Sequence, residues 1–182
     1  TMISLKSIVT KKLLNYFFIN PRENLYVNEI ARKLQLDKRN LVKKMQELEK
    51  EGILRNQARG NLKFYSINQN YPLYHEYKQI VIKTLGFEEN LRKNLKGIDN
   101  IKKAYIYGSY AKDKMDVHSD IDLLIIGNHD IVPLQRRLNK IQKEINREIN
   151  VVNMSQGERL KRMKNKDPFI KEVFRHKNIR VV

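Results

Sequence analysis

The sequence has no cysteine and no tryptophan, and only 7 glycines and 4 prolines among its 182 residues. The lack of cysteine excludes disulfides, thiolate metal sites and cysteine nucleophiles, and it is consistent with a reducing, cytoplasmic location. No apolar run approaches the roughly 20 residues that a membrane-spanning helix needs. Residues 1–6 lack the charged and then apolar order of a signal peptide, so we expect no targeting segment there.

Acidic residues are scarce beside basic ones. The chain carries 37 Lys and Arg against 20 Asp and Glu, for a formal net charge of +17. Residues 1–85 hold 16 basic and 7 acidic residues, and residues 86–182 hold 21 and 13, so both halves are basic. Such a field attracts polyanions, and charge alone leaves DNA, RNA, nucleotides and an anionic membrane surface open. A length of 182 residues suits one ordinary domain or two small ones. A hydrophobic share of 41% is enough to build their cores.

Residues 1–70 change from helical to strand periodicity. Apolar spacing predicts three helices, over residues 5–19, 27–34 and 38–51, with Asp37 as the N-cap of the third. After Gly52 the pattern is that of a hairpin, with strands over 53–57 and 62–67 on either side of a glycine turn.

This order of elements resembles the winged helix-turn-helix of prokaryotic transcription regulators, over roughly residues 3–68. The resemblance implies that the third helix is a recognition helix in the major groove of DNA and that the hairpin is the wing. The candidate DNA-binding residues lie on that helix and on the wing: Lys38, Arg39, Asn40, Lys43, Lys44, Arg59 and Lys63. Solvated charges on an ordinary helix and a protein-interaction module are the alternatives.

A connecting helix is predicted over residues 71–86. Pro72 suits the first turn of a helix, and Gly86 ends the apolar stripe. A homodimer seam and a plain interdomain linker are equally open for this segment.

Two segments of the second half carry chemistry. Gly108-Ser109-Tyr110-Ala111 follows an apolar strand, and Ser119-Asp120-Ile121-Asp122 leads into the apolar run 123–126. Residues i and i+2 of a strand point to the same face, so Asp120 and Asp122 are expected to converge. Two close carboxylates repel each other unless a cation lies between them, and oxygen ligands suit Mg²⁺ or Mn²⁺. Gly108 permits close approach of the backbone to a ligand, and Ser109 offers a hydroxyl to a phosphate.

The joint pattern is similar to the signature of the DNA polymerase beta-like nucleotidyltransferase superfamily, and most of all to its minimal prokaryotic branch, over roughly residues 86–182. The resemblance implies a mixed sheet with helices on one side and an NTP substrate. It implies phosphate binding by Gly108 and Ser109 and metal binding by Asp120 and Asp122. Ser119 and Arg147 are further nucleotide-binding candidates, although an Arg such as Arg147 is more often a surface or ion-pair residue.

The third carboxylate of that superfamily is expected on the strand over residues 148–152, after a helix over 132–146. Asn150 occupies the position and is our third candidate metal ligand. An amide oxygen ligates a metal weakly and cannot accept a proton as a base at neutral pH. Glu148 points to the same face and is the alternative acid, so the sequence leaves catalysis open while favouring it.

Together these patterns predict an α+β protein with a winged helix over residues 1–70, a connecting helix over 71–86 and a minimal nucleotidyltransferase domain over 87–182. A packing helix over 167–174 and a last strand over 179–182 are expected near the end. The predicted function is Mg²⁺-dependent transfer of NMP from an NTP to a hydroxyl of a protein or RNA, coupled to DNA binding and with no membrane partner. The alternative is a DNA-binding transcription regulator that senses nucleotide with weak or no catalysis.

Overall fold

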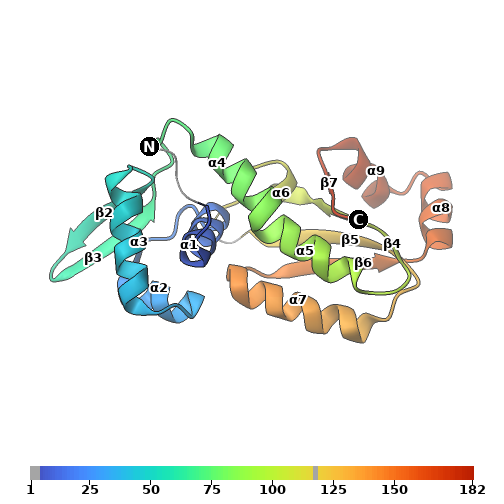
Figure 1. Cartoon of the computed structure of the whole chain (residues 1–182). Helices are drawn as coiled ribbons and strands as arrows, with labels where there is room; N and C mark the ends of the chain where they lie inside the picture. The colour runs from blue at the N-terminus through green and yellow to red at the C-terminus, as the bar shows by residue number, and fades with distance from the viewer. Residues whose placement is uncertain (1–4, 117–118) are drawn as a thin grey trace. The chain divides into compact units, whose positions relative to one another are not determined.

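The structure is a computed structural model that describes residues 5–116 and 119–182 and divides into two compact units (Figure 1). The first unit is Thr1–Glu89 with Glu144–Asn146, and the second is Asn90–Lys143 with Arg147–Val182. Residues 1–4 of the predicted winged helix and residues 117–118 of the predicted polar loop lie outside the described residues. Within the described part of the chain, no helix has the length and apolar character needed to cross a membrane.

Residues 5–67 of the first unit form three short helices and a three-stranded antiparallel sheet in the order β1-β3-β2. The helices and strands are α1 (Ile8–Ile19), β1 (Leu25–Tyr26), α2 (Val27–Leu34), α3 (Lys38–Lys50), β2 (Leu54–Arg59) and β3 (Leu62–Ile67). The three predicted helices and the hairpin are confirmed. The sequence missed β1, because a two-residue strand has no periodicity of its own and is defined only by its pairing with β3.

Helix α3 begins where the sequence predicted, because the Asp37 carboxylate accepts a hydrogen bond from the Asn40 backbone N–H at 3.0 Å. Leu41, Met45 and Leu48 are buried on one side of α3, as their spacing predicted, which leaves its basic residues on the outside. The hairpin turns at Gly60, whose φ of +56° is a left-handed conformation that favours glycine.

The connecting helix differs in detail from the prediction. It is α4 (Tyr74–Ile80) followed by a π-helical segment, Val81–Leu85, before α5 (Phe87–Lys96) starts a new helix. Its buried side chains are Tyr74, Tyr77, Val81 and Ile82, whereas Leu73 and Ile80, which belong to the apolar stripe of the sequence, are each 47% exposed. A π-helix has more residues per turn than an α-helix, so the buried face departs from simple 3.6-residue periodicity.

The second unit is built on a four-stranded mixed sheet in the order β6-β5-β4-β7. Its strands are β4 (Ile101–Tyr107), β5 (Ile121–Gly127), β6 (Ile149–Met154) and β7 (Ile179–Arg180). Strand β5 is antiparallel to β4 and parallel to β6, and β7 is antiparallel to β4. The predicted mixed sheet is confirmed, including its short last strand.

Helices cover both faces of this sheet, whereas the resemblance implied one. Helices α5 and α7 (Ile131–Ile145) lie over one face (Figure 1). Helix α9 (Pro168–Arg175) covers part of the other face, where Ile170 and Val173 pack against Leu124 and Ile126 of β5. Asp122 stands two residues before Leu124 and four before Ile126 in β5, so its side chain lies on the same face of the sheet as theirs, the α9 face.

Helix α8 (Gln156–Lys164) was not predicted. None of its residues is buried, so it has no apolar stripe to detect. A capping signal is nevertheless present, because Ser155 accepts a hydrogen bond from the Glu158 N–H at 3.0 Å and Glu158 lies in the first turn. The Ser-x-x-Glu spacing could have identified the start of this helix.

Candidate functional site

The two aspartates lie at one end of the mixed sheet. Asp122 is in β5, with Tyr107 of β4 as its partner on one side and Asn150 of β6 on the other. Asp120 stands just before β5, where the Ile121 N–H donates to the Glu148 carbonyl at 2.9 Å and so carries the β5–β6 pairing up to the aspartate. The three strands therefore bring together residues that are far apart in the sequence.

The aspartates influence each other electrostatically. Burial raises the pKa of Asp122, and the charge of Asp120 raises it further, while hydrogen bonding from Asn150 lowers it. The Asn150 amide also donates to the Asp120 carboxylate, with 3.2 Å between Nδ2 and Oδ2. Asp120, Asp122 and Asn150 therefore converge, as expected from their spacing, and their mutual repulsion is only partly relieved by the amide.

Gly108 lies directly against the Asp122 carboxylate. A Cβ atom at this position would come within 2.1 Å of Asp122 Oδ2, and the Gly108 φ of +71° disfavours any other residue. The chain then forms the single turn α6 (Gly108–Ala111), which places Ser109 next to Gly108 and directly after β4. Within the described part of the chain, no group of the protein hydrogen-bonds the Ser109 hydroxyl, so it is available to a ligand.

Ser119 and Arg147 have other contacts in this structure. The Ser119 hydroxyl accepts from the Asp116 N–H and donates to the Asp116 carboxylate, both at 2.9 Å. Arg147 donates to the carbonyls of Asp116 and Ser119, each at 2.8 Å. Both side chains thus hold the segment that leads into Asp120, and nucleotide binding by them stays a prediction.

Two further residues border the site. Glu148, the alternative acid, is exposed just before β6. Tyr107, to which sequence reasoning gave no role, is half-buried, and burial followed by the charge of Asp122 raises the pKa of its hydroxyl. Its ring packs edge-on against Phe169 of α9, with 5.7 Å between the centroids. The signal for Tyr107 was its position just before Gly108.

The donor atoms fit a hard divalent cation. Asp120 and Asp122 offer carboxylate oxygens, and Asn150 can offer an amide oxygen after rotation of its side chain. Burial raises the pKa of Asp122 most and the charge of Asp120 raises it further, and a bound cation would offset both effects. Among residues 5–116 and 119–182, no three His, Cys, Asp or Glu side chains form a metal-binding group. The site therefore offers two carboxylates rather than three.

Without a cation, Asp122→Asn is expected to stabilise the protein at neutral pH. The folded-state pKa of Asp122 is raised, so its ionisation destabilises the fold as the pH rises through that pKa. We expect the midpoint of thermal unfolding to rise by about 1–3 °C near pH 7 and the gain to vanish at about pH 4. Asp99→Asn, an exposed turn residue of the same unit, is the control. Equal midpoints for wild type and Asp122→Asn near pH 7 would show that the ionised Asp122 carboxylate does not destabilise the fold.

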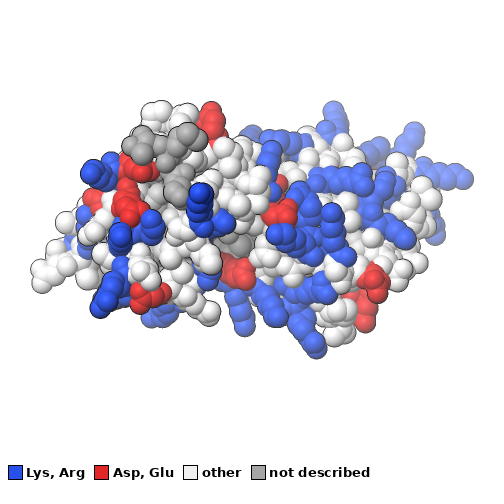
Figure 2. All heavy atoms as spheres, in the orientation of Figure 1, with Lys and Arg blue, Asp and Glu red and all other residues white. Residues whose placement is uncertain are grey.

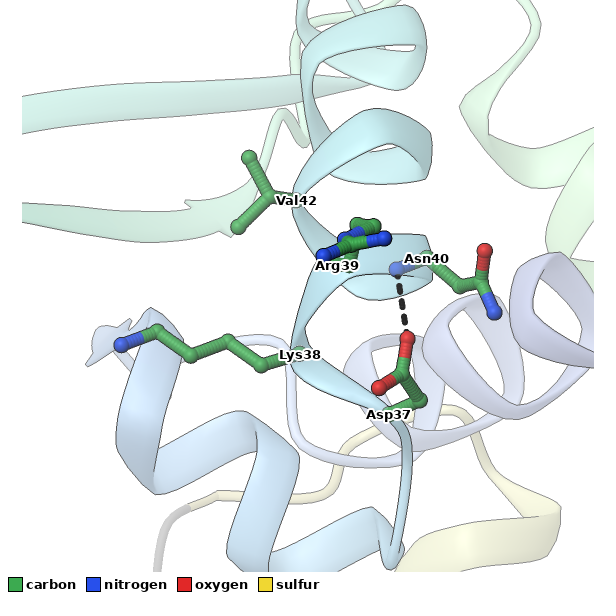
Figure 3. Close-up of a pocket in the computed structure, with 5 residues that line it drawn as sticks. All are labelled: Asp37, Lys38, Arg39, Asn40 and Val42. Carbon is green, nitrogen blue, oxygen red and sulfur yellow. Dashed lines mark hydrogen bonds between the residues drawn. The ribbon is translucent and has the colours of Figure 1, made fainter.

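A second candidate site lies on α3 in the first unit. Lys38, Arg39, Asn40 and Lys43 are exposed. The first three line a hollow of about 730 Å³ together with Asp37 and Val42 (Figure 3). Figure 3 shows Lys38 and Asn40 pointing to opposite sides of the helix start, with Arg39 between them. None of the described carboxylates pairs with Lys38, Arg39 or Lys43, so their charges are available to an anionic partner.

The remaining candidate cations contact other side chains of the first unit. Lys44 pairs with Glu47, and Lys63 pairs with Glu49 at 2.8 Å, a contact that raises the pKa of Lys63. Arg59 lies over the ring of Phe64, at 5.1 Å from its centroid, next to the hairpin turn. The candidate cations with no carboxylate partner among the described residues are therefore Lys38, Arg39 and Lys43 on α3 and Arg59 on the hairpin.

Comparison with known proteins identifies one family. Residues 89–179, half of the chain, match the family described as "Polymerase beta, Nucleotidyltransferase". No curated protein matches the chain. A crystal structure of a toxin–antitoxin with AMP-PNP is similar over 52% of this chain and 72% of that chain, at 15% identity and a TM-score of 0.38. A proposed nucleotidyltransferase from Sulfolobus solfataricus is similar over 41% of this chain and 68% of that chain, at 19% identity and a TM-score of 0.29. These two structural scores are too low to carry an argument.

Proposed function

The chain belongs to the polymerase beta nucleotidyltransferase family, and on that basis we propose that its second unit binds an NTP with Mg²⁺ or Mn²⁺ and transfers NMP to a hydroxyl. The observation that carries the proposal is the placement of Asp122. Its carboxylate lies against Gly108, beside the Ser109 turn, and in register with Asn150. An anion-binding turn and a pair of converging carboxylates are the two parts that nucleotidyl transfer requires.

Each part of the site has a distinct task in this reaction. The acceptor oxygen forms a bond to the α-phosphorus as the bond to pyrophosphate breaks, and the hydroxyl proton passes to a base. Ser109 donates its hydroxyl to a phosphate oxygen, and Gly108 lets the triphosphate approach the backbone. Asp120 and Asp122 hold the cation, which when bound neutralises charge on the triphosphate and the leaving pyrophosphate.

The proton of the acceptor hydroxyl needs a base, and the third position of the site does not supply one. Asn150 stands at the third position and cannot accept a proton. Glu148 is exposed two residues away and is the nearest alternative on the same strand edge. This arrangement favours a second candidate function, in which the unit binds nucleotide with little or no turnover and acts as the sensor of a DNA-binding regulator.

The first unit supports the DNA-binding part of both candidates. Its element order, three helices and a short strand that pairs with a two-stranded hairpin, supports the winged-helix interpretation. Lys38, Arg39 and Lys43 are exposed on α3, the helix that would enter the major groove. We propose duplex DNA as its partner, and a homodimer seam along residues 71–86 stays a prediction.

The transfer reaction is tested by incubating the protein with each of the four NTPs, Mg²⁺ or Mn²⁺, and protein or RNA acceptors. Intact-mass measurement would show a gain of one NMP on the acceptor or on the chain itself. Calorimetry with the same NTPs measures nucleotide binding, which both candidates predict. Binding without transfer indicates the sensor, and binding with transfer indicates the enzyme. Absence of both transfer and metal-dependent NTP binding would reject both.

Duplex binding is expected to depend on Arg39 and Lys43. Replacing either by Ala removes a cation that no described carboxylate pairs with, and we expect weaker binding to all sequences. The slope of log affinity against log salt concentration should become shallower by about 1 for each lost phosphate contact. Fluorescence anisotropy with a labelled duplex over a salt series measures this. Lys83→Ala, an exposed lysine outside α3 and the hairpin, should keep the wild-type slope; equal slopes for all three variants would dismiss the assigned surface.

A further inference from the structure

Helices α8 and α9 form a groove that the proposed function does not use. Its volume is about 330 Å³, and it is lined by the apolar side chains Met163, Ile170 and Phe174. Met163 is 47% exposed. An exposed apolar surface of this kind on an otherwise basic segment is a candidate interaction site.

The rim of the groove is positively charged. Lys166, Lys171 and Arg175 line it, and residues 156–182 contain nine Lys and Arg against three Asp and Glu. Figure 2 shows blue Lys and Arg spheres gathered around white surface, which belongs to uncharged residues, in the region of α8 and α9. None of these three rim cations forms an ion pair with a carboxylate in the described part of the chain.

The acidic residues of this segment are already engaged. Asp167 accepts from the Ile170 N–H at 3.1 Å as the N-cap of α9. Glu158 pairs with Arg162 at 2.7 Å, and Glu172 lies 3.5 Å from Lys112. The free charge at the groove is therefore positive, and an acidic partner would complement it.

We propose that this groove binds an amphipathic helix of a partner protein whose apolar face is flanked by Asp and Glu. The aliphatic side chains of the floor suit Leu, Ile or Met anchors at helical spacing, and the rim cations suit carboxylates beside them. Met163 is unbranched and adapts to different anchors. A nucleic acid fits less well, because Arg159 covers one face of the Phe174 ring, 5.4 Å from its centroid, and Tyr105 packs against the same ring in a T-shaped contact, which limits base stacking on it.

The 182-residue chain is tested with four fluorescent probes. The first is a helical peptide of about 18 residues, five turns, with a Leu stripe flanked by Glu. The others are the same peptide with Lys in place of Glu, polyglutamate of equal length and a single-stranded oligothymidylate. We expect binding of the acidic amphipathic peptide, and weaker binding of polyglutamate, which lacks apolar anchors.

Variants assign the binding to the groove. Lys171→Glu with Arg175→Glu, and separately Met163→Glu, should each lower affinity for the acidic peptide at least about fivefold. The double variant should gain affinity for the Lys peptide. Lys164→Glu, the same charge reversal on α8 outside the groove lining, should bind the acidic peptide as wild type does. All these positions are exposed, and thermal unfolding checks that each variant folds.

Three results would overturn the proposal. The first is no binding of the acidic peptide to the wild-type chain. The second is unchanged affinity in both groove variants. The third is a loss of oligothymidylate binding in these variants while peptide binding persists, because that would assign the groove to nucleic acid.

Discussion

Asp122→Asn is expected to lower nucleotidyl transfer at least about 10²-fold, because it removes one of two charges that hold the cation while keeping the shape of the side chain. Asp122 is half-buried, lies against Gly108 and is coupled to Asp120, so water cannot readily replace its carboxylate. The measurement is transfer from an NTP labelled at the α-phosphate, with the NTP and acceptor found by the mass screen.

A loss of stability cannot explain that result if the thermal prediction also holds, since Asp122→Asn should raise the unfolding midpoint without a cation. Asp99→Asn should transfer at the wild-type rate. Metal-dependent NTP binding should fall in Asp122→Asn under either candidate function. If Asp122→Asn binds and transfers as well as wild type, Asp122 has no part in the site.

Asn150→Asp is expected to raise transfer about tenfold or more, because a carboxylate at this position adds a metal ligand and a base, and general-base catalysis is typically worth about 10²–10⁴-fold. The register of β5 and β6 pairs Asn150 with Asp122, and its amide lies 3.2 Å from Asp120. The new carboxylate should therefore enter the site without movement of the backbone. Steady-state transfer rates at several metal concentrations are the measurement.

The Asn150 prediction has two matched controls. Asn128→Asp makes the same chemical change at an exposed position after β5 and should leave the rate unchanged. Asn150→Ala removes the amide without adding an acid and should not raise transfer. If Asn150→Asp instead lowers transfer, the amide itself is required, and Glu148→Gln then tests Glu148 as the base.

The spacing of apolar residues, with caps and turns, was sufficient to predict most helices and strands of this fold. The start of α3 follows from Asp37 and the apolar spacing of Leu41, Met45 and Leu48, all of which act within one helix. The sequence analysis missed β1, α5 and α8. Strand β1 exists only through its pairing with β3, and α8 buries none of its residues, so neither has a periodic apolar signal. Helix α5 did carry a signal, because Phe87, Leu91 and Leu95 recur at helical spacing and are buried. The sequence signal for α8 was the spacing of Ser155 and Glu158 at its start.

The sequence by itself determined that Asp120 and Asp122 share a face and that Gly108 precedes Ser109, because alternation along a strand and backbone freedom are local properties. Only the tertiary structure decided that Asp122 fills the space beside Gly108 and that Ser119 and Arg147 hold the segment before Asp120. It also set the Asn150 amide against Asp120. These contacts join side chains on different strands and loops, and their geometry depends on how the sheet pairs rather than on any local pattern.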